Sequence, residues 1–268
     1  MSLRALKQYI ELYHYYGLSD FFLESQVFQK PLNTQPQKKS INSNSNYITR
    51  ESYKDSNNKQ IYDFEYDVET TDFTFLQRKY ANCFKCSFSK SRWKFVYGEG
   101  QQNAQCMLIG NPPITDENAN GKPFVGHSGD LFNKMMASIG IKREDLYITN
   151  IIKCKPNYID YSEIQKCMPY LLEQIRILKP KIILVMGDIA ANALFTTLHH
   201  VKSTSQQINL LKENIDYYRL HQGQLYQNIP IYVTYNPFDL LRNIDLKKLA
   251  WEDLKLFRDH FLKIKNSE

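Results

Sequence analysis

Apolar positions change their spacing along the chain, and these changes divide it into three zones. In residues 1–24 apolar side chains recur every three or four positions, which predicts one amphipathic helix ending near Gly17. Residues 25–72 are mostly polar and include the run KKSINSNSN after two prolines, so we expect a flexible linker with too little apolar surface to fold. Residues 73–268 are predicted to form the globular domain.

Strand-like and helix-like patterns alternate within the globular zone. This alternation predicts an α/β fold with an open, mostly parallel sheet. Ligands of such sheets bind beyond the carboxyl ends of the strands, so the loops that begin near Gly110, Asn150, Gly187 and Asn236 are the candidate sites. The predicted strands are 106–109, 147–152, 181–186 and 229–235, and the predicted helices are 129–139, 163–178, 188–198 and 246–264.

Length and charge narrow the class of protein only slightly. A chain of 268 residues has room for one substantial domain and an appendage, and we expect a monomer. Its 34 Lys and Arg against 28 Asp and Glu permit a nucleic-acid partner. The 19 Tyr and 15 Phe could stack on bases, although core packing accounts for most of them.

The apolar runs do not predict a membrane protein. No run reaches the roughly 18 residues of a transmembrane helix. No continuous apolar segment follows the first residues either, so a secretory signal is not expected and the cytoplasm is the expected compartment.

The five cysteines, an odd number in a chain expected to be cytosolic, favour metal binding or free thiols over disulfides. Cys83 and Cys86 form a C-x2-C pair, and Cys154 and Cys167 follow far downstream. Four thiolates suit either a structural zinc ion or a [4Fe–4S] cluster, and the alternative is that the four are buried apolar residues. Cys106 falls within a predicted strand and is interpreted as a core residue.

Seven segments of the globular zone occur in an order that resembles a known family. They are CFKC (83–86), VYGEG (96–100), GKPFVG (121–126), YITNIIKCKP (147–156), KPKIILVMG (179–187), TYNPFDLLR (234–242) and LAWEDL (249–254). Together they resemble the family 4 uracil-DNA glycosylases, the iron–sulfur branch of that superfamily. The resemblance implies a three-layer fold with a four-stranded parallel sheet. It also implies that Cys83, Cys86, Cys154 and Cys167 hold a [4Fe–4S] cluster.

The resemblance further implies hydrolysis of the bond between uracil and deoxyribose in uracil-containing DNA, after the base has been flipped out of the stack. The family's stacking position falls on Phe124 and its edge-reading position on Asn150, whose amide can both donate and accept. Without the surrounding motifs, Phe124 would equally suit core packing and Asn150 a strand-end turn.

Two catalytic positions differ from the family's pattern. The family's Gly-Glu-x-Pro-Gly is GNPPI here, so Asn111 replaces a carboxylate and Ile114 replaces a glycine. The family's His-Pro is Asn-Pro, with Asn236 in place of the imidazole. Losing one preorganised group costs about 10²–10³ in rate and two losses need not multiply, so we expect a loss of at least ~10³. Asp116 and Glu117 remain as acidic residues that could supply a carboxylate, or could only cap and solubilise the loop.

Contacts with the DNA backbone are expected from basic residues in the strand-end loops. Lys122, Lys153, Lys155 and Arg242 have this placement and could meet phosphates, although a solvated basic surface is the alternative.

Two functions from different classes therefore remain open. The first is a uracil-DNA glycosylase with weakened activity. The second is a catalytically silent DNA-binding or replisome accessory protein, which Asn111 and Asn236 favour. Its protein partner would dock on the N-terminal helix of residues 1–24. That layout resembles the psi subunit of bacterial DNA polymerase III by architecture alone.

Overall fold

The computed structural model describes residues 48–54, 60–67, 72–198, 215–220, 222–226 and 228–266. The helix predicted for residues 1–24 lies outside them, as does the first part of the predicted linker, residues 25–47. Within the described residues no helix combines the length and the apolar character needed to cross a membrane.

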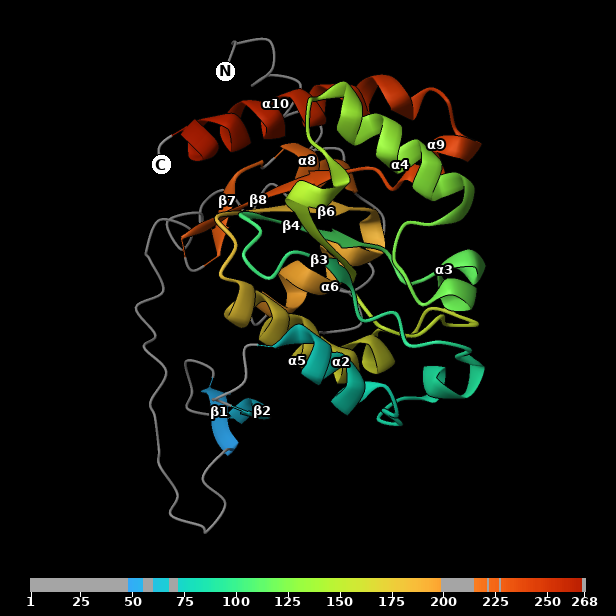
Figure 1. The fold of residues 1–268 in the computed structure, drawn as a ribbon, viewed down its shortest axis with the longest axis vertical. Coiled ribbons are helices and arrows are strands. Elements are labelled where there is room, and N and C mark those ends of the chain that lie inside the picture. Colours follow the sequence, from blue (N-terminus) through green and yellow to red (C-terminus); the bar gives the residue numbers. More distant parts are fainter. Residues whose placement is uncertain are drawn as a thin grey trace, which may run out of the picture.

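The main sheet has six strands in the order β3-β5-β4-β6-β8-β7 (Figure 1). The four in the middle are parallel, as predicted, and each edge adds one short antiparallel strand that the apolar pattern did not reveal. The strands are β3 (Glu99–Gly100), β4 (Cys106–Gly110), β5 (Leu146–Asn150), β6 (Ile182–Met186), β7 (Gln224–Tyr226) and β8 (Ile229–Thr234).

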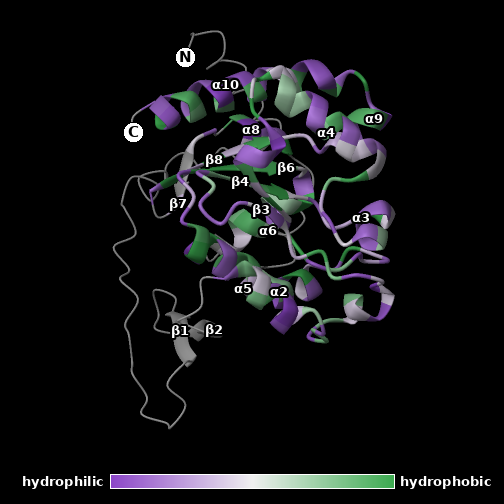
Figure 2. Cartoon of the chain, in the orientation of Figure 1, coloured by the Kyte–Doolittle hydropathy of each residue, from purple (hydrophilic) through white to green (hydrophobic). Residues whose placement is uncertain are grey.

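The central strands are apolar throughout because both faces of the sheet are covered. Every residue of β4, β5 and β6 is buried, as is usual for parallel strands between two helical layers. β4 and β6 are largely green in Figure 2, whereas α10 alternates green and purple as an amphipathic helix does. Sheet and helices therefore form the three layers that were predicted.

The two helical layers enclose separate parts of the core. Leu171 and Leu194 pack with Val185 on one face of the sheet, and Phe132 and Phe257 pack in the core of the other face. Helices α2 (Phe73–Tyr80), α5 (Tyr161–Leu178), α6 (Asp188–Leu198) and α8 (Ile215–Leu220) contribute to the first core, and α4 (Gly126–Ser138), α9 (Pro237–Arg242) and α10 (Leu246–Asn266) to the second.

The remaining elements are short and lie in the loops. They are α3 (Thr115–Asn120) and two turns of 3₁₀-helix, η3 (Ser87–Ser91) and η4 (Arg143–Asp145). The helices predicted within the globular zone, 129–139, 163–178, 188–198 and 246–264, all exist, with ends shifted by at most a few residues. Asp160 sets one such start, because its side chain accepts a hydrogen bond from the Ser162 N–H at 2.8 Å and caps α5.

The linker prediction for residues 25–72 is wrong for two segments. β1 (Ile48–Lys54) and β2 (Gln60–Asp67) pair as antiparallel strands. The sequence of β2, QIYDFEYD, places an aromatic residue at every second position, which is typical of a strand. The polar composition of the zone concealed this alternation.

Candidate active site

The carboxyl ends of the parallel strands meet at one edge of the sheet, as the predicted topology requires. Gly110 at the end of β4 is in register with Asn150 of β5 on one side and Met186 of β6 on the other. Met186 is in turn opposite Thr234 of β8. The residues that follow these positions, including Asn111 and Asn236, are therefore neighbours in space.

Phe124 and Asn150 lie together beside Gly110, as the resemblance implied. A Cβ atom at Gly110 would lie 2.5 Å from the Phe124 ring and 3.6 Å from Asn150 Nδ2, so only glycine leaves room for this ring. The Phe124 ring is buried, and its centroid is 4.7 Å from that of Phe132. The backbone of Phe124 has a positive φ of 49°, which is unusual for a bulky residue.

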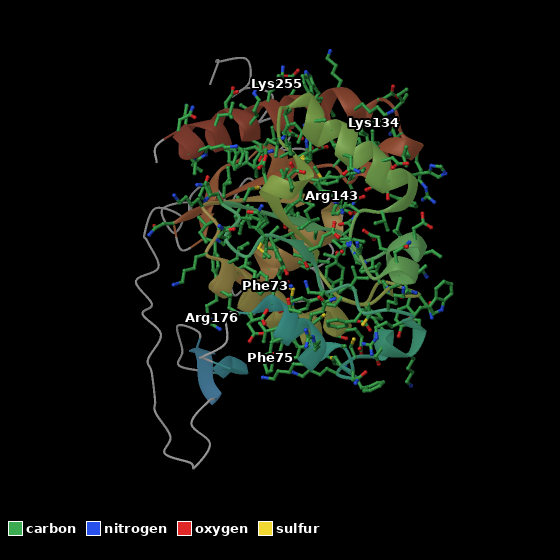
Figure 3. All side chains as sticks on the ribbon, in the orientation of Figure 1. Phe73, Phe75, Lys134, Arg143, Arg176 and Lys255 are labelled. Atoms are coloured by element: carbon green, nitrogen blue, oxygen red, sulfur yellow. The ribbon has the colours of Figure 1, made fainter. Side chains whose placement is uncertain are left out.

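Arg143 fixes the loop that carries Phe124. Its guanidinium, labelled in Figure 3, donates to the backbone oxygens of Pro123 at 2.7 Å and Phe124 at 3.1 Å. The same group forms an ion pair with Glu99 of β3 at 2.6 Å. The short edge strand thus helps to hold the unusual backbone of Phe124.

Asn150 presents an unsatisfied acceptor to the site. Its Nδ2 donates to the backbone oxygen of Asn111 at 2.7 Å. Its Oδ1 is buried and has no hydrogen-bond partner in the part of the chain that the structure describes. A buried acceptor left unpaired costs about 1–3 kcal/mol, so this oxygen favours a ligand that brings a donor.

Asn111 is bound to the start of α6. Its Oδ1 accepts from the Ala190 N–H at 3.0 Å, and its Nδ2 donates to Asp188 Oδ1 at 3.2 Å. The amide lies so close to Gly187 that a Cβ there would be 2.3 Å from Asn111 Oδ1. The side chain is therefore held by the protein itself and caps a helix.

Asn236 is also held by backbone groups. Its Oδ1 accepts from the Phe238 N–H at 2.9 Å and caps α9, and its Nδ2 donates to the backbone oxygen of Met186 at 3.1 Å. Only 8% of the residue is exposed. One hydrogen of Nδ2 remains for a ligand.

Glu117 ties together the two ends of the loop around α3. One carboxylate oxygen accepts from the Ile114 N–H at 2.7 Å and the other from the Phe124 N–H. Burial raises the pKa of this carboxyl to about 7, against the lowering effect of the two backbone donors and of the Asn150 side chain. The geometry favours the capping alternative for Glu117 over a catalytic carboxylate.

The four paired cysteines converge on one region. Cys83 and Cys86 pack against the core cluster that contains Cys154 and Cys167, and all four are free thiols. Cys83, Cys86 and Cys154 interact electrostatically with one another. Cys167 interacts in the same way with Cys86 and Cys154. Burial raises the pKa of Cys167 to about 12, so metal binding there would have to displace a proton.

Two of the four thiols accept hydrogen bonds from nearby side chains. Within the described ranges, no group of three or more Cys, His, Asp or Glu side chains is placed to hold one metal ion. The sulfurs also receive polar hydrogens, from the Tyr170 hydroxyl to Cys83 at 3.0 Å and from Arg92 to Cys154 at 3.4 Å.

Comparison with known proteins identifies the family. The model of the Uracil DNA glycosylase superfamily matches residues 97–255. The chain belongs to this superfamily. Its described sheet and the convergence of Phe124 with Asn150 lie within the matched region.

Its similarity is to the type-4 members. The type-4 uracil-DNA glycosylase of Archaeoglobus fulgidus is 37% identical over 143 residues, which cover 50% of this chain and 72% of the relative. That of Pyrobaculum aerophilum is 32% identical over 190 residues, covering 69% and 93%. That of Saccharolobus solfataricus is 35% identical over 187 residues, covering 66% and 81%. The resemblance found in the sequence is confirmed.

Lys153, one of the four residues predicted to contact DNA phosphates, is buried. Lys153 is 0% exposed, and its Nζ donates to Gln174 Oε1 at 2.7 Å and to the Asn150 backbone oxygen at 2.9 Å. The prediction that Lys153 meets phosphates is wrong, because the chain turns inward after β5. Lys122 and Arg242 are exposed and Lys155 is half-buried, so their DNA contacts stay predictions.

Sequence reasoning missed two carboxylates that follow strand ends. Asp188 directly follows Gly187 at the end of β6, and Asp239 lies in the first turn of α9. Burial and, to a smaller extent, the charge of Asp188 raise the pKa of Asp239 to about 6. Their positions just after strand ends are the signal that could have revealed them.

Proposed function

We propose that this chain is a uracil-DNA glycosylase with weakened activity, which hydrolyses the N-glycosidic bond of flipped-out deoxyuridine. The observation that carries the proposal is the unpartnered Asn150 Oδ1, buried beside Phe124. The N3–H of uracil is a donor flanked by two carbonyl acceptors. An amide oxygen can accept from N3–H while its nitrogen donates to the neighbouring carbonyl, and this pairing distinguishes uracil from cytosine.

Phe124 and Asn150 would act on the base and leave the bond cleavage to other groups. The Phe124 ring would stack on the flipped base, whose unstacking from the duplex costs a few kcal/mol. Arg143 and Glu117 are positioning residues in this scheme, because both hold the backbone of Phe124. A pocket built this way binds uracil before any chemistry occurs.

Weak activity follows from the engagement of Asn111 and Asn236. Both amides already satisfy backbone groups of the protein, and neither carries a charge. Each missing preorganised group costs about 10²–10³ in rate. Asn236 retains one N–H that can donate to the leaving uracil oxygen.

Asp188 is our candidate for the missing carboxylate. Its Oδ1 lies 3.2 Å from Asn111 Nδ2, and the side chain is half-buried at the strand-end edge. As the bond between N1 and C1′ breaks, its electron pair leaves with uracil and the sugar becomes cation-like. A carboxylate there would stabilise that charge, orient the attacking water and accept its proton. The departing uracil anion would be protonated by solvent.

We also propose that Cys83, Cys86, Cys154 and Cys167 hold a [4Fe–4S] cluster. The support is their convergence as free thiols and the donors from Tyr170 and Arg92. The cluster would supply a covalent connection between the segment before β3 and the segments around α5. A structural role of this kind requires no electron transfer.

A catalytically silent DNA-binding or replisome accessory protein is the second candidate. The observation that favours it is the use of both Asn111 and Asn236 as helix caps. The predicted docking helix at 1–24 lies outside the described residues, so a protein partner remains a proposal. Deleting residues 1–24 and repeating a pull-down tests it, and unchanged partner capture would contradict docking through this segment.

Uracil release from single-stranded and duplex oligonucleotides tests the first candidate. The protein is purified anaerobically, and the double variant Asn111→Glu with Asn236→His is measured beside it. Slow release by the unmodified chain is the expected result. If only the double variant releases uracil, the pocket is intact and the silent alternative is correct.

A further inference from the structure

Three large aromatic side chains project from the surface near the predicted cluster cysteines. Phe84 is 77% exposed, Trp93 70% and Tyr158 60%. Exposed apolar rings of this size are costly in water, and a group of them indicates a binding surface.

The segments that carry these rings contact one another. The Arg92 guanidinium lies 5.7 Å from the Phe84 ring and donates to the backbone oxygen of Cys83 at 2.9 Å. The Tyr158 ring is 6.2 Å from that of Phe88 in η3. The Ser91 hydroxyl joins the two segments by donating to the backbone oxygen of Lys155 at 2.8 Å. We call this the aromatic–basic surface.

Most charges of the aromatic–basic surface are positive. Residues 83–98 contain no Asp or Glu. Two acidic residues follow Tyr158 in the chain: Asp160 caps α5, and Glu163 accepts from the Ser87 N–H and pairs with Lys166. The cations of the surface form no ion pair with any described carboxylate, and they are Lys85, Lys90, Arg92, Lys94, Lys122 and Lys155.

The aromatic–basic surface reaches the rim of the uracil pocket. The side chain of Lys94 is 3.2 Å from the position that a Cβ atom would take at Gly121. Gly121 begins the loop that carries Lys122 and Phe124. The Trp93 N–H donates to Asn118 Oδ1 of α3 at 2.9 Å, which holds this segment against the start of the same loop. A strand leaving the pocket would therefore cross Lys94 and Trp93.

We infer that the aromatic–basic surface binds the single-stranded DNA that flanks the flipped nucleotide. Its rings would stack on unpaired bases and its cations would contact the phosphates. Paired bases cannot offer their faces to Phe84, Trp93 or Tyr158, so single strands should bind more tightly than duplex. The place of this strand beside the pocket rests on the proposed function, whereas the binding itself needs no cleavage.

Fluorescence of Trp93 tests the inference directly. The chain has two tryptophans, and Trp251→Phe leaves Trp93 as the only one. Uracil-free single-stranded DNA should quench Trp93 emission at concentrations where a duplex of equal length does not. Unchanged Trp93 emission on addition of single-stranded DNA, or equal affinities for the two forms, would overturn the inference.

A second test measures the binding of single-stranded DNA by single-residue variants of the chain. Trp93→Ala should weaken single-strand binding about 10-fold, because each base–aromatic stack contributes on that scale. Trp251→Ala is the matched control, since Trp251 is 39% exposed on α10, in the helical layer on the sheet face opposite α5 (Figure 1). Equal binding by the two variants would contradict the inference.

Failure of the proposed function gives a different result. A protein that releases no uracil but shows Trp93-dependent single-strand binding would refute the glycosylase activity and support this inference. A protein that releases uracil but whose single-strand binding does not depend on Trp93 would support the glycosylase activity and refute this inference. Iron content and thermal unfolding of each variant verify that the fold is retained.

Discussion

Asn111 and Asp188 share a hydrogen bond between the ends of β4 and β6, at 3.2 Å. The neutral amide can accept from the α6 N-terminus and donate to the carboxylate at once. A glutamate in its place would meet Asp188 as a like charge. The neutral amide at position 111 is therefore compatible with the carboxylate of Asp188 beside it.

Asp188→Asn tests whether that charge acts on the sugar. We expect uracil release to fall about 10²–10³-fold, as for loss of one electrostatic group. Binding to DNA carrying a neutral tetrahydrofuran should be unchanged, whereas binding to a cationic pyrrolidine analogue should weaken. Asp239→Asn is the matched control, and an equal effect of both variants would argue against a specific role for Asp188.

Lys153 and Lys155 are two residues apart and should behave in opposite ways. Lys153→Met removes the hydrogen bonds that Nζ donates to Gln174 Oε1 and to the Asn150 backbone oxygen, so it should lower the free energy of unfolding by about 1–3 kcal/mol. Lys155→Met should weaken DNA binding at low salt with little change in stability. Denaturant unfolding and DNA titration of both variants check this, and DNA binding lost only in Lys153→Met would restore the original interpretation.

At the scale of elements, α3 and the turn after it form a closed unit on which the pocket depends. Glu117 joins the Ile114 and Phe124 backbones, and Arg143 holds the same turn from η4. α3 has only six residues and cannot be stable alone. The position of Phe124 therefore depends on the side chains of Glu117 and Arg143.

The buried Glu117 predicts a pH dependence for this unit. Burial raises its pKa from an ordinary 4.5 to about 7 in the folded protein. The folded state then binds the Glu117 proton more tightly than the unfolded state does. The stability that protonated Glu117 contributes is therefore fully present below about pH 4.5 and is lost as pH rises through about 7.

Glu117→Gln is the variant that isolates this effect. The unfolding free energy of the unmodified chain minus that of the variant should decrease from acidic to mildly alkaline pH. A difference that grows with pH would show that the hydrogen-bond donors outweigh burial at Glu117, and a constant difference would show that the two effects cancel; either result would contradict the raised pKa.

At the scale of the whole molecule, the four paired cysteines come from three separate parts of the chain. Cys83 and Cys86 precede β3, Cys154 follows β5 and Cys167 lies within α5. The aromatic–basic surface is built on the same segments. Its shape should therefore depend on the proposed cluster.

Cys154→Ala tests that dependence. We expect loss of iron and of visible absorbance, faster proteolysis within residues 83–98 and weaker single-strand binding. Cys106→Ala is the control, because Cys106 is buried in β4 and should affect stability through a cavity without loss of iron. Iron retained by Cys154→Ala would show that Cys154 is not a ligand.

Much of the fold could be predicted from local pattern. The four parallel strands are long apolar runs, and the helices between them carry apolar residues at helical spacing. β3 and β7 have two and three residues, too few for any period to appear. β1 and β2 were missed because their polar composition was given more weight than the alternation in QIYDFEYD.

The sequence by itself determined the superfamily, the parallel sheet and the meeting of Phe124 with Asn150, because these follow from periodicity and from motifs read along the chain. Only the tertiary structure decided that Lys153 points into the core, that Asn111 and Asn236 cap helices, and that Asp188 lies beside Asn111. A side chain's direction and partners depend on residues that are distant in sequence and near in space.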